Sequence, residues 1–205
     1  IMRTNKPTII GYNNIHNSIL KNARDIKSNL NIANKEYFYK KISDKSWYFS
    51  NHDGLEIECD NPGIKGEIQI SNAAAAIQAI HCCDYVELNQ KYINVGLKNA
   101  SIIGRFQVLD KKPETILDIA HNEQSVEKLI ENLRSYYSSR KLHAVFGVLK
   151  DKNLDLILNP LKNIFESWHI SHSNNERALS VHELKKNNFF ILEKPNVYDT
   201  IEDAY

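Results

Sequence analysis

The chain has 205 residues, of which 42% are hydrophobic and 25% charged, and its formal net charge is +1. This composition is typical of a globular protein with one large or two small domains. The near-neutral charge argues against nucleic-acid or membrane-surface partners, which select basic surfaces. No apolar run approaches the roughly 18 residues that cross a bilayer.

The first hundred residues predict short strands and amphipathic helices. A buried strand is expected at 8–12 and a helix over 17–30, where apolar residues recur at helical spacing. Four short aromatic or alternating runs, separated by turn residues, predict a small antiparallel sheet; they are 37–39, 47–49, 55–59 and 67–70. The alanine-rich run 71–80 predicts a helix that Ser71 or Asn72 could cap, and another helix is expected over 89–98.

Composition and pattern change near residues 99–106, and from there strands alternate with helices. The predicted strands are 115–120, 142–148, 168–171 and 189–192. Helices are predicted over 126–137, over 154–165 with a kink at Pro160, and after a capping box formed by Ser180 and Glu183. This alternating order predicts an α/β fold with a parallel, doubly wound sheet.

Polar residues follow the carboxyl ends of two of these strands, where open parallel sheets bind their ligands. The residues after the first strand are Asp118, His121 and Asn122, and those after the second are Gly147, Lys150 and Asp151. Both loops are therefore expected to open on the same edge of the sheet.

Asp118 and His121 form the clearest candidate pair. A carboxylate at a strand end suits the hydroxyls of a ribose. A histidine at a helix N-terminus lies in a partial positive field that attracts phosphate or carboxylate. The pattern alone equally allows Asp118 and Asn122 to be helix caps and His121 to be a solvated loop residue.

Two further candidates are Arg105 and Asn72. Arg105 lies at the composition change and could bind a phosphate bidentately across a domain junction. On its own, however, a surface arginine beside a hinge glycine is the simpler interpretation. Asn72 could bind adenine through the donor and acceptor of its amide, although an N-cap is again simpler.

Metal and redox sites are not expected in this chain. The remaining histidines lack metal-ligand spacing. The three cysteines, Cys59, Cys82 and Cys83, are too sparse for a disulfide framework, which favours a reducing, cytoplasmic compartment. The start Ile1-Met2-Arg3 and the end at Tyr205, inside a helical pattern, lead us to expect a piece of a longer chain.

Five short motifs occur in one order along the chain. They are an opening Ile-Met-Arg with Lys-Pro before a strand, Asn-Ala-Ala, Gly-Arg-Phe-Gln, Leu-Asp-x-Ala-His-Asn and Phe-Gly-Val-Leu-x-Asp-Lys, within segments 1–11, 71–76, 104–107, 117–122 and 145–152. Together they resemble the folylpolyglutamate synthase/dihydrofolate synthase family of the muramyl-ligase-like, ATP-dependent amide ligases. The third and fifth motifs favour the folate branch over the peptidoglycan branch.

The resemblance implies two domains. Residues 1–103 would be the end of a P-loop-type central ATPase domain, and residues 104–205 a truncated, Rossmann-like C-terminal domain. It also implies that Asn72, Arg105 and Asp118 contact ATP, and that His121 lies near the γ-phosphate and the incoming glutamate. The phosphate loop and the Mg²⁺ ligands would precede Ile1, so residues 1–205 alone are expected to be inactive.

The implied activity is the ATP-dependent addition of L-glutamate to dihydropteroate, folate or both, through an acyl phosphate. His121 and Arg105 would be the catalytic residues, ATP and Mg²⁺ the cofactors, and the enzyme a monomer. Two alternatives remain. One is another muramyl-ligase-like amide ligase, of the muramyl-peptide or cyanophycin type. The other is a non-catalytic, Rossmann-like binding module.

Overall fold

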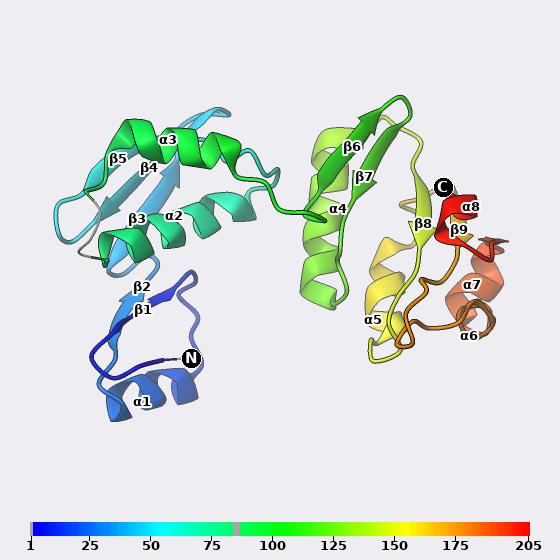
Figure 1. Cartoon of the computed structure of the whole chain (residues 1–205), viewed down its shortest axis with the longest axis horizontal. Helices are drawn as coiled ribbons and strands as arrows, with labels where there is room; N and C mark the ends of the chain where they lie inside the picture. Colours follow the sequence, from blue (N-terminus) through cyan, green and yellow to red (C-terminus); the bar gives the residue numbers. More distant parts are fainter. Residues whose placement is uncertain (1, 84–86) are drawn as a thin grey trace. The chain divides into compact units, whose positions relative to one another are not determined.

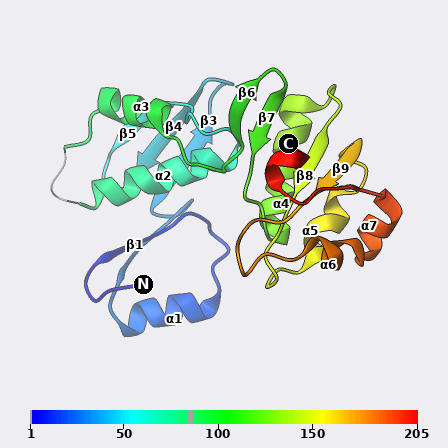
Figure 2. The ribbon, with the colours of Figure 1, turned by 45° about the vertical axis from the view of Figure 1, so that its right-hand side comes forward.

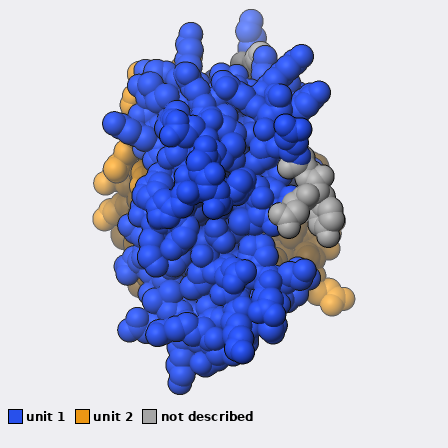
Figure 3. All heavy atoms as spheres, turned by 90° about the vertical axis from the view of Figure 1, so that its left-hand side faces the viewer, with its two compact units in different colours: residues 1–117 blue, residues 118–205 orange. Residues whose placement is uncertain are grey.

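The computed structural model describes residues 2–83 and 87–205. Internal contacts divide the chain into two compact units, residues 1–117 and 118–205, which Figure 3 shows in different colours. Ile1, the first residue of the motif segment 1–11, lies outside the described residues. The division between residues 103 and 104 that the resemblance implies stays a prediction.

Unit 1 begins with two parallel strands joined by a helix: β1 (Pro7–Ile10), α1 (Asn17–Asp25) and β2 (Asn29–Ile32). The strand at 8–12 and the start of the helix are confirmed. The prediction that the helix continues to Leu30 is wrong. Lys27 has a φ of 55°, a left-handed conformation that ends helices, and Leu30 pairs with Thr8 in the sheet.

A three-stranded antiparallel sheet follows, as predicted. Its strands pair in the order β3–β4–β5, and Figures 1 and 2 show α2 and α3 beside it. The elements are β3 (Tyr37–Lys41), β4 (Ser46–Asn51), β5 (Glu56–Asp60), α2 (Ile68–His81) and α3 (Gln90–Asn99). The sheet and α2 bury Tyr37, Trp47 and Phe49 completely.

Two predictions about α2 are wrong. Residues 67–70 are not a strand, because the helix already begins at Ile68, after Gly66 with a φ of 114°. Asn72 is consequently not an N-cap; it lies inside the helix, exposed, and its Nδ2 donates to Oε1 of Gln69 at 3.0 Å.

Unit 1 ends with a hairpin of two strands, β6 (Gln107–Lys111) and β7 (Glu114–Leu117). The strand predicted at 115–120 is therefore present but shorter. Its expected place in the parallel sheet is wrong, because β7 pairs antiparallel with β6 and the pairing puts Leu117 opposite Gln107.

Unit 2 is an α/β unit with a parallel sheet, as the alternation of strands and helices predicted. The hydrogen-bonded strand order is β8–β9–β10, and every pairing is parallel. Helices separate the strands along the chain (Figure 1). The elements are α4 (Glu123–Tyr137), β8 (His143–Phe146), α5 (Leu154–Leu158), the 3₁₀ helix η1 (Asn159–Leu161), β9 (Ser167–Ile170), α6 (Val181–Lys185), α7 (Asn188–Glu193), β10 (Asn196–Val197) and α8 (Ile201–Ala204).

Two local predictions for unit 2 are confirmed. The helix that starts at Leu154 changes to 3₁₀ geometry at Pro160, and Ser180 with Glu183 forms the expected capping box of α6. The strand predicted at 189–192 is wrong. Those residues belong to α7, whose first turn is capped by Asn187, and the third strand is β10.

The core of unit 2 is built around Trp168 in β9. Its ring makes edge-to-face contacts with Phe165, Phe189 and Phe190, with ring centroids 5.0–5.6 Å apart, and Phe146 of β8 lies 5.9 Å away. Such aromatic contacts stabilise a core beyond simple burial. The core therefore fixes β8 and β9, and with them the loops at their carboxyl ends.

Candidate functional site

The loop that follows β7 is held by its own polar groups. Asp118 is half-buried, and its Oδ1 accepts a hydrogen bond from the backbone N–H of Ala120 at 2.8 Å. Asn122 caps α4 by accepting from the backbone N–H of Ser125 at 3.0 Å, and the Ser125 hydroxyl lies 3.1 Å from the Asn122 N–H. The expected strand-end position of Asp118 and the capping role of Asn122 are thus confirmed.

His121 lies in the same loop with an exposed side chain. Its Nδ1 is 2.9 Å from the carbonyl oxygen of Ile119, and its backbone N–H donates to Oγ of Ser125. A carbonyl oxygen only accepts hydrogen bonds, so Nδ1 carries the proton in this arrangement. The neutral ring then has its lone pair on Nε2, which can accept a hydrogen bond from a proton donor.

The second loop follows β8 and leads into α5. β8 ends at Phe146, so Gly147, Lys150 and Asp151 follow it as predicted. A Cβ at Gly147 would lie 3.2 Å from the carbonyl oxygen of Ser171, so glycine lets the ends of β8 and β9 approach closely. Asn153 caps α5 through hydrogen bonds from the N–H groups of Asp155 and Leu156.

The two loops meet at one cavity of about 230 Å³. Its lining residues come from the start of α4, from the loop between β8 and α5 and from α5 itself; they are His121, Asn122, Glu123, Asp151, Lys152, Asn153 and Leu156. The two loops therefore lie together, although not at one edge of a shared sheet, because β7 pairs with β6 and not with β8. Polar groups thus converge at the carboxyl end of a parallel strand, where α/β proteins bind small molecules.

Asp151 lines this cavity and forms ion pairs with two basic side chains. Its Oδ2 lies 2.9 Å from Nζ of Lys152, and its Oδ1 lies 3.4 Å from a guanidinium nitrogen of Arg177. The hydrogen bond from Lys152 is the main cause that lowers the pKa of Asp151, with a smaller contribution from the charge of Arg177. Asp151 therefore stays ionised near neutral pH and holds two cations beside the cavity.

Sequence reasoning missed Lys152 and Arg177 as site residues. Lys152 closes the fifth motif, and its place just after a strand end was an available signal. Arg177 lies in the loop after β9, and only tertiary structure brings it to Asp151.

The other two sequence candidates lie in unit 1. Arg105 is exposed in a turn in which Gly104 has a φ of 73° and donates to Oε1 of Gln107 at 3.1 Å. Asn72 is exposed on α2. Their expected contacts with ATP, and their convergence with Asp118 and His121, stay predictions.

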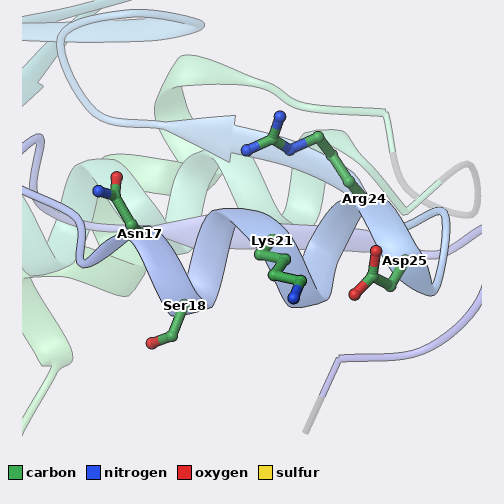
Figure 4. Close-up of a pocket in the computed structure, with 5 residues that line it drawn as sticks. All are labelled: Asn17, Ser18, Lys21, Arg24 and Asp25. Atoms are coloured by element: carbon green, nitrogen blue, oxygen red, sulfur yellow. The ribbon is translucent and has the colours of Figure 1, made fainter.

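A larger hollow of about 450 Å³ lies on unit 1, but it is formed by the surface of a single helix. All its lining residues belong to α1: Asn17, Ser18, Lys21, Arg24 and Asp25. Figure 4 shows these side chains spread along the helix without converging on one point. Within residues 2–83 and 87–205, no group of three or more His, Cys, Asp and Glu could hold a metal ion, and no helix is long and apolar enough to cross a membrane.

Similarity to known proteins agrees with this geometry. Residues 104–205 match the family model of the Mur ligase glutamate ligase domain, so this half of the chain belongs to the Mur-type ligases. Over 205 residues, the chain is 29% identical to dihydrofolate synthase/folylpolyglutamate synthase of Buchnera aphidicola subsp. Acyrthosiphon pisum, covering 100% of this chain and 48% of that protein. The chain belongs to the folylpolyglutamate synthase/dihydrofolate synthase family.

Further relatives support this assignment. The Escherichia coli (strain K12) protein of the same name is 27% identical over 184 residues, which are 90% of this chain and 42% of that protein. The structure of E. coli FolC in complex with ADP, without folate substrate, aligns with a TM-score of 0.85 and 26% identity, covering 100% of this chain and 47% of that chain. Thermotoga maritima folylpolyglutamate synthase aligns with a TM-score of 0.77 and 26% identity, covering 99% and 49%. The chain thus spans about half the length of the relatives it matches.

Proposed function

We propose that this chain is part of an ATP-dependent ligase that adds L-glutamate to dihydropteroate, to folate or to both. The observation that carries the proposal is the cavity in unit 2, where His121 and Lys152 meet at the carboxyl end of a parallel strand in a chain of this family. A site of this size and polarity suits a small, charged substrate. The complete protein that carries these residues is called the intact enzyme below.

The chemistry requires activation of a carboxylate. Amide formation from a free carboxylate is uphill in water, so the γ-phosphoryl group of ATP is first transferred to the carboxylate oxygen, giving an acyl phosphate and ADP. The α-amine of glutamate, in its neutral form, attacks the acyl carbon. The C–O bond to phosphate breaks, inorganic phosphate leaves and the amine loses its second proton. Positioning and charge stabilisation supply most of the catalysis in such reactions.

We assign roles to four residues in this reaction. Asn72 contacts the adenine, Asp118 the ribose and Arg105 the phosphates, while His121 lies in the region of the γ-phosphate and the incoming glutamate. A closing motion about residues 100–106 would bring Arg105 together with Asp118 and His121 on one nucleotide. ADP in the E. coli FolC structure supports the choice of nucleotide.

We propose that the reaction also uses Mg²⁺ and that the residues that bind this ion lie outside residues 1–205. The described part of the chain offers no cluster of ligands for it, so no step is assigned to Mg²⁺ here. We also propose that the intact enzyme is a cytoplasmic monomer.

A second candidate reaction is the joining of an amino acid to a muramyl peptide. One observation favours it: the chain is 28% identical over 131 residues to the UDP-N-acetylmuramoyl-L-alanyl-D-glutamate–2,6-diaminopimelate ligase of Buchnera aphidicola subsp. Schizaphis graminum, covering 62% of this chain and 22% of that protein. The folate relatives match over longer stretches at similar identity, and we therefore place the folate reaction first.

The test measures phosphate release by the purified intact enzyme with ATP, L-glutamate and either dihydropteroate, a reduced folate or a UDP-muramyl peptide. Phosphate release that requires both glutamate and a pterin substrate is expected. Release only with the muramyl substrate would establish the second candidate, and release with neither would favour a non-catalytic module. Residues 1–205 alone are expected to show no glutamate-dependent phosphate release and only weak ATP binding.

A further inference from the structure

The helix α2 buries mostly small side chains. Besides Gln78, its buried residues are Ile70, Ser71, Ala73, Ala74 and Ile77. Alanine and serine side chains fill little volume, so they supply few of the interlocking contacts that fix how a helix is rotated and where it lies along its axis. A buried polar contact can supply that constraint, as a single buried asparagine does in coiled coils.

Gln78 makes such a contact with two strands. Its side chain is 1% exposed. Its Oε1 accepts a hydrogen bond from Nδ2 of Asn51 in β4 at 3.1 Å, and its Nε2 donates to Oδ1 of Asn31 in β2 at 2.8 Å. The three amides thus form one chain from β4 through α2 to β2. A buried network of this kind favours one arrangement, because a displaced helix would leave buried polar groups without partners.

Both partners of Gln78 belong to regular structure. Oδ1 of Asn51 accepts from the backbone N–H of Asp53 at 3.1 Å, in the turn between β4 and β5, and Asn31 lies within β2, which pairs with β1. A second link from α2 to this turn, the 2.9 Å ion pair of His81 with Asp53, is open to solvent and therefore weaker. Gln78 consequently fixes α2 against two strands at once.

Asn72 lies on the same helix, about 9 Å along the axis from Gln78, and it is exposed. A rotation or slide of α2 would therefore displace the amide of Asn72, and a hydrogen bond to a ligand weakens with shifts of a few tenths of an ångström. Nδ2 of Asn72 donates to Oε1 of Gln69 at 3.0 Å, but Gln69 belongs to α2 and would move with it. The amide is thus placed within unit 1 by contacts of α2 with other elements.

We propose that Gln78 is a positioning residue for the nucleotide, because its contacts with Asn31 and Asn51 hold α2 where the amide of Asn72 meets the adenine. The proposal rests on the proposed ligase function, in which Asn72 contacts the adenine, and adds a residue that acts through Asn72. The adenine is remote from the reacting phosphate, so this contact is equally strong in the ground state and the transition state. Its loss should therefore raise the KM for ATP and leave kcat unchanged.

The experiment is a double-mutant cycle in the intact enzyme with Gln78→Met and Asn72→Ala. It measures KM and kcat for ATP at saturating L-glutamate and pterin substrate. We expect each single variant to raise the KM for ATP at least about threefold, which corresponds to one net hydrogen bond, and to change kcat less than about twofold. In the Asn72→Ala background, Gln78→Met should change this KM less than about twofold, because the contact through which Gln78 acts is already absent.

Ile77→Val is the matched control. It removes a methyl group from the neighbouring buried residue, so it should lower the urea midpoint of unfolding while the KM for ATP stays within about twofold of wild type. If Gln78→Met does not fold, Asn31→Val takes its place in the cycle with the same expected result, because it removes the acceptor of Nε2 of Gln78.

The outcomes separate the positioning role from the ligase function. An unchanged KM for ATP in Gln78→Met, or the same increase with and without the Asn72 side chain, would overturn the positioning role. An active enzyme whose KM for ATP is unchanged by Asn72→Ala would overturn the adenine contact and the positioning role together. A wild-type enzyme without phosphate release that requires glutamate and a pterin substrate would instead overturn the proposed function.

Discussion

The imidazole Nδ1 of His121 lies 2.9 Å from the backbone carbonyl oxygen of Ile119, two residues earlier in the chain. This contact orients the ring at the edge of the cavity and assigns the lone pair of the neutral ring to Nε2. If His121 acts on the phosphate–glutamate region, the variant His121→Ala in the intact enzyme should lower kcat by on the order of a hundredfold or more. Steady-state assay of phosphate release measures this loss.

The control for this prediction is His143→Ala. His143 is an exposed histidine of β8 whose Nδ1 is 2.7 Å from Oγ of Ser167, and it does not line the cavity. The variant should keep kcat within about twofold of wild type. Equal activity of the His121 and His143 variants would mean that His121 is a solvated loop residue that takes no part in catalysis.

Arg105 provides a separate test of the proposed closing motion. Removing a cation that stabilises charge on transferring phosphate costs on the order of a hundred- to a thousandfold in kcat, so Arg105→Ala in the intact enzyme should be nearly inactive. Arg105→Lys should recover little, because lysine does not reproduce the guanidinium fork. Arg134→Ala, an exposed position on α4, is the control. Unchanged turnover in Arg105→Ala would remove the hinge hypothesis.

Sequence patterns predicted the long elements and failed at short apolar runs. The helix α4 has a long, regular periodicity, and the strands of the sheet β3–β5 are alternating or aromatic runs separated by turn residues; both were found. Residues 189–192 are a four-residue apolar run, which periodicity cannot assign to a strand or a helix; the cap from Asn187 decides for the helix α7. The third parallel strand, β10, has only two residues and no such signal.

The candidate site shows the same limit at the level of tertiary structure. His121 and Asp151, which both line the cavity, could be proposed from the sequence because each lies in a loop that follows a strand. The ion pair of Asp151 with Arg177 could not, because 26 residues separate the two and no local pattern marks Arg177. Long-range side-chain partners depend on how loops fold back, and that is fixed by packing rather than by local propensity.

Two glycines of unit 1 should respond oppositely to alanine. A Cβ at Gly63 would lie 2.5 Å from the carbonyl oxygen of Lys98 and 3.0 Å from that of Ala100, both backbone atoms. Gly63→Ala should therefore lower the free energy of unfolding by about 1–3 kcal/mol. Gly96 lies exposed in α3 with open space around it, and Gly96→Ala should raise the free energy of unfolding by about 0.5–1 kcal/mol.

Urea denaturation of residues 1–205 measures both variants. Trp47 lies in the core of unit 1 and Trp168 in that of unit 2, and they are the two tryptophans of the sequence. A Trp168→Phe background therefore makes fluorescence report on unit 1. A Gly63→Ala protein as stable as its parent would show that the loop before α2 shifts freely away from Lys98.

The core of unit 1 should lose stability at alkaline pH. Burial, aided by the nearby charges of Asp60 and Glu58, raises the pKa of the Cys59 thiol to about 12. Burial likewise raises the pKa of Tyr37 to about 12. Both groups are fully buried. Their folded-state pKa values lie above the ordinary values of 9.0 and 10.0, so ionisation favours the unfolded chain once the pH passes those values.

Below pH 9 the two groups should therefore cause no pH dependence in the free energy of unfolding of unit 1. Between pH 9 and 12 this free energy should fall as the pH rises. Between pH 9 and 10 the thiol contributes most of this dependence, because its ordinary pKa is the lower of the two. Cys59→Ala should flatten the profile in that range, whereas Cys83→Ala, at an exposed thiol, should leave it unchanged. The measurement is urea denaturation at half-unit pH steps, followed through Trp47. Identical slopes for the two variants would mean that water reaches Cys59 in the folded chain, and that its thiol ionises as readily there as in the unfolded one.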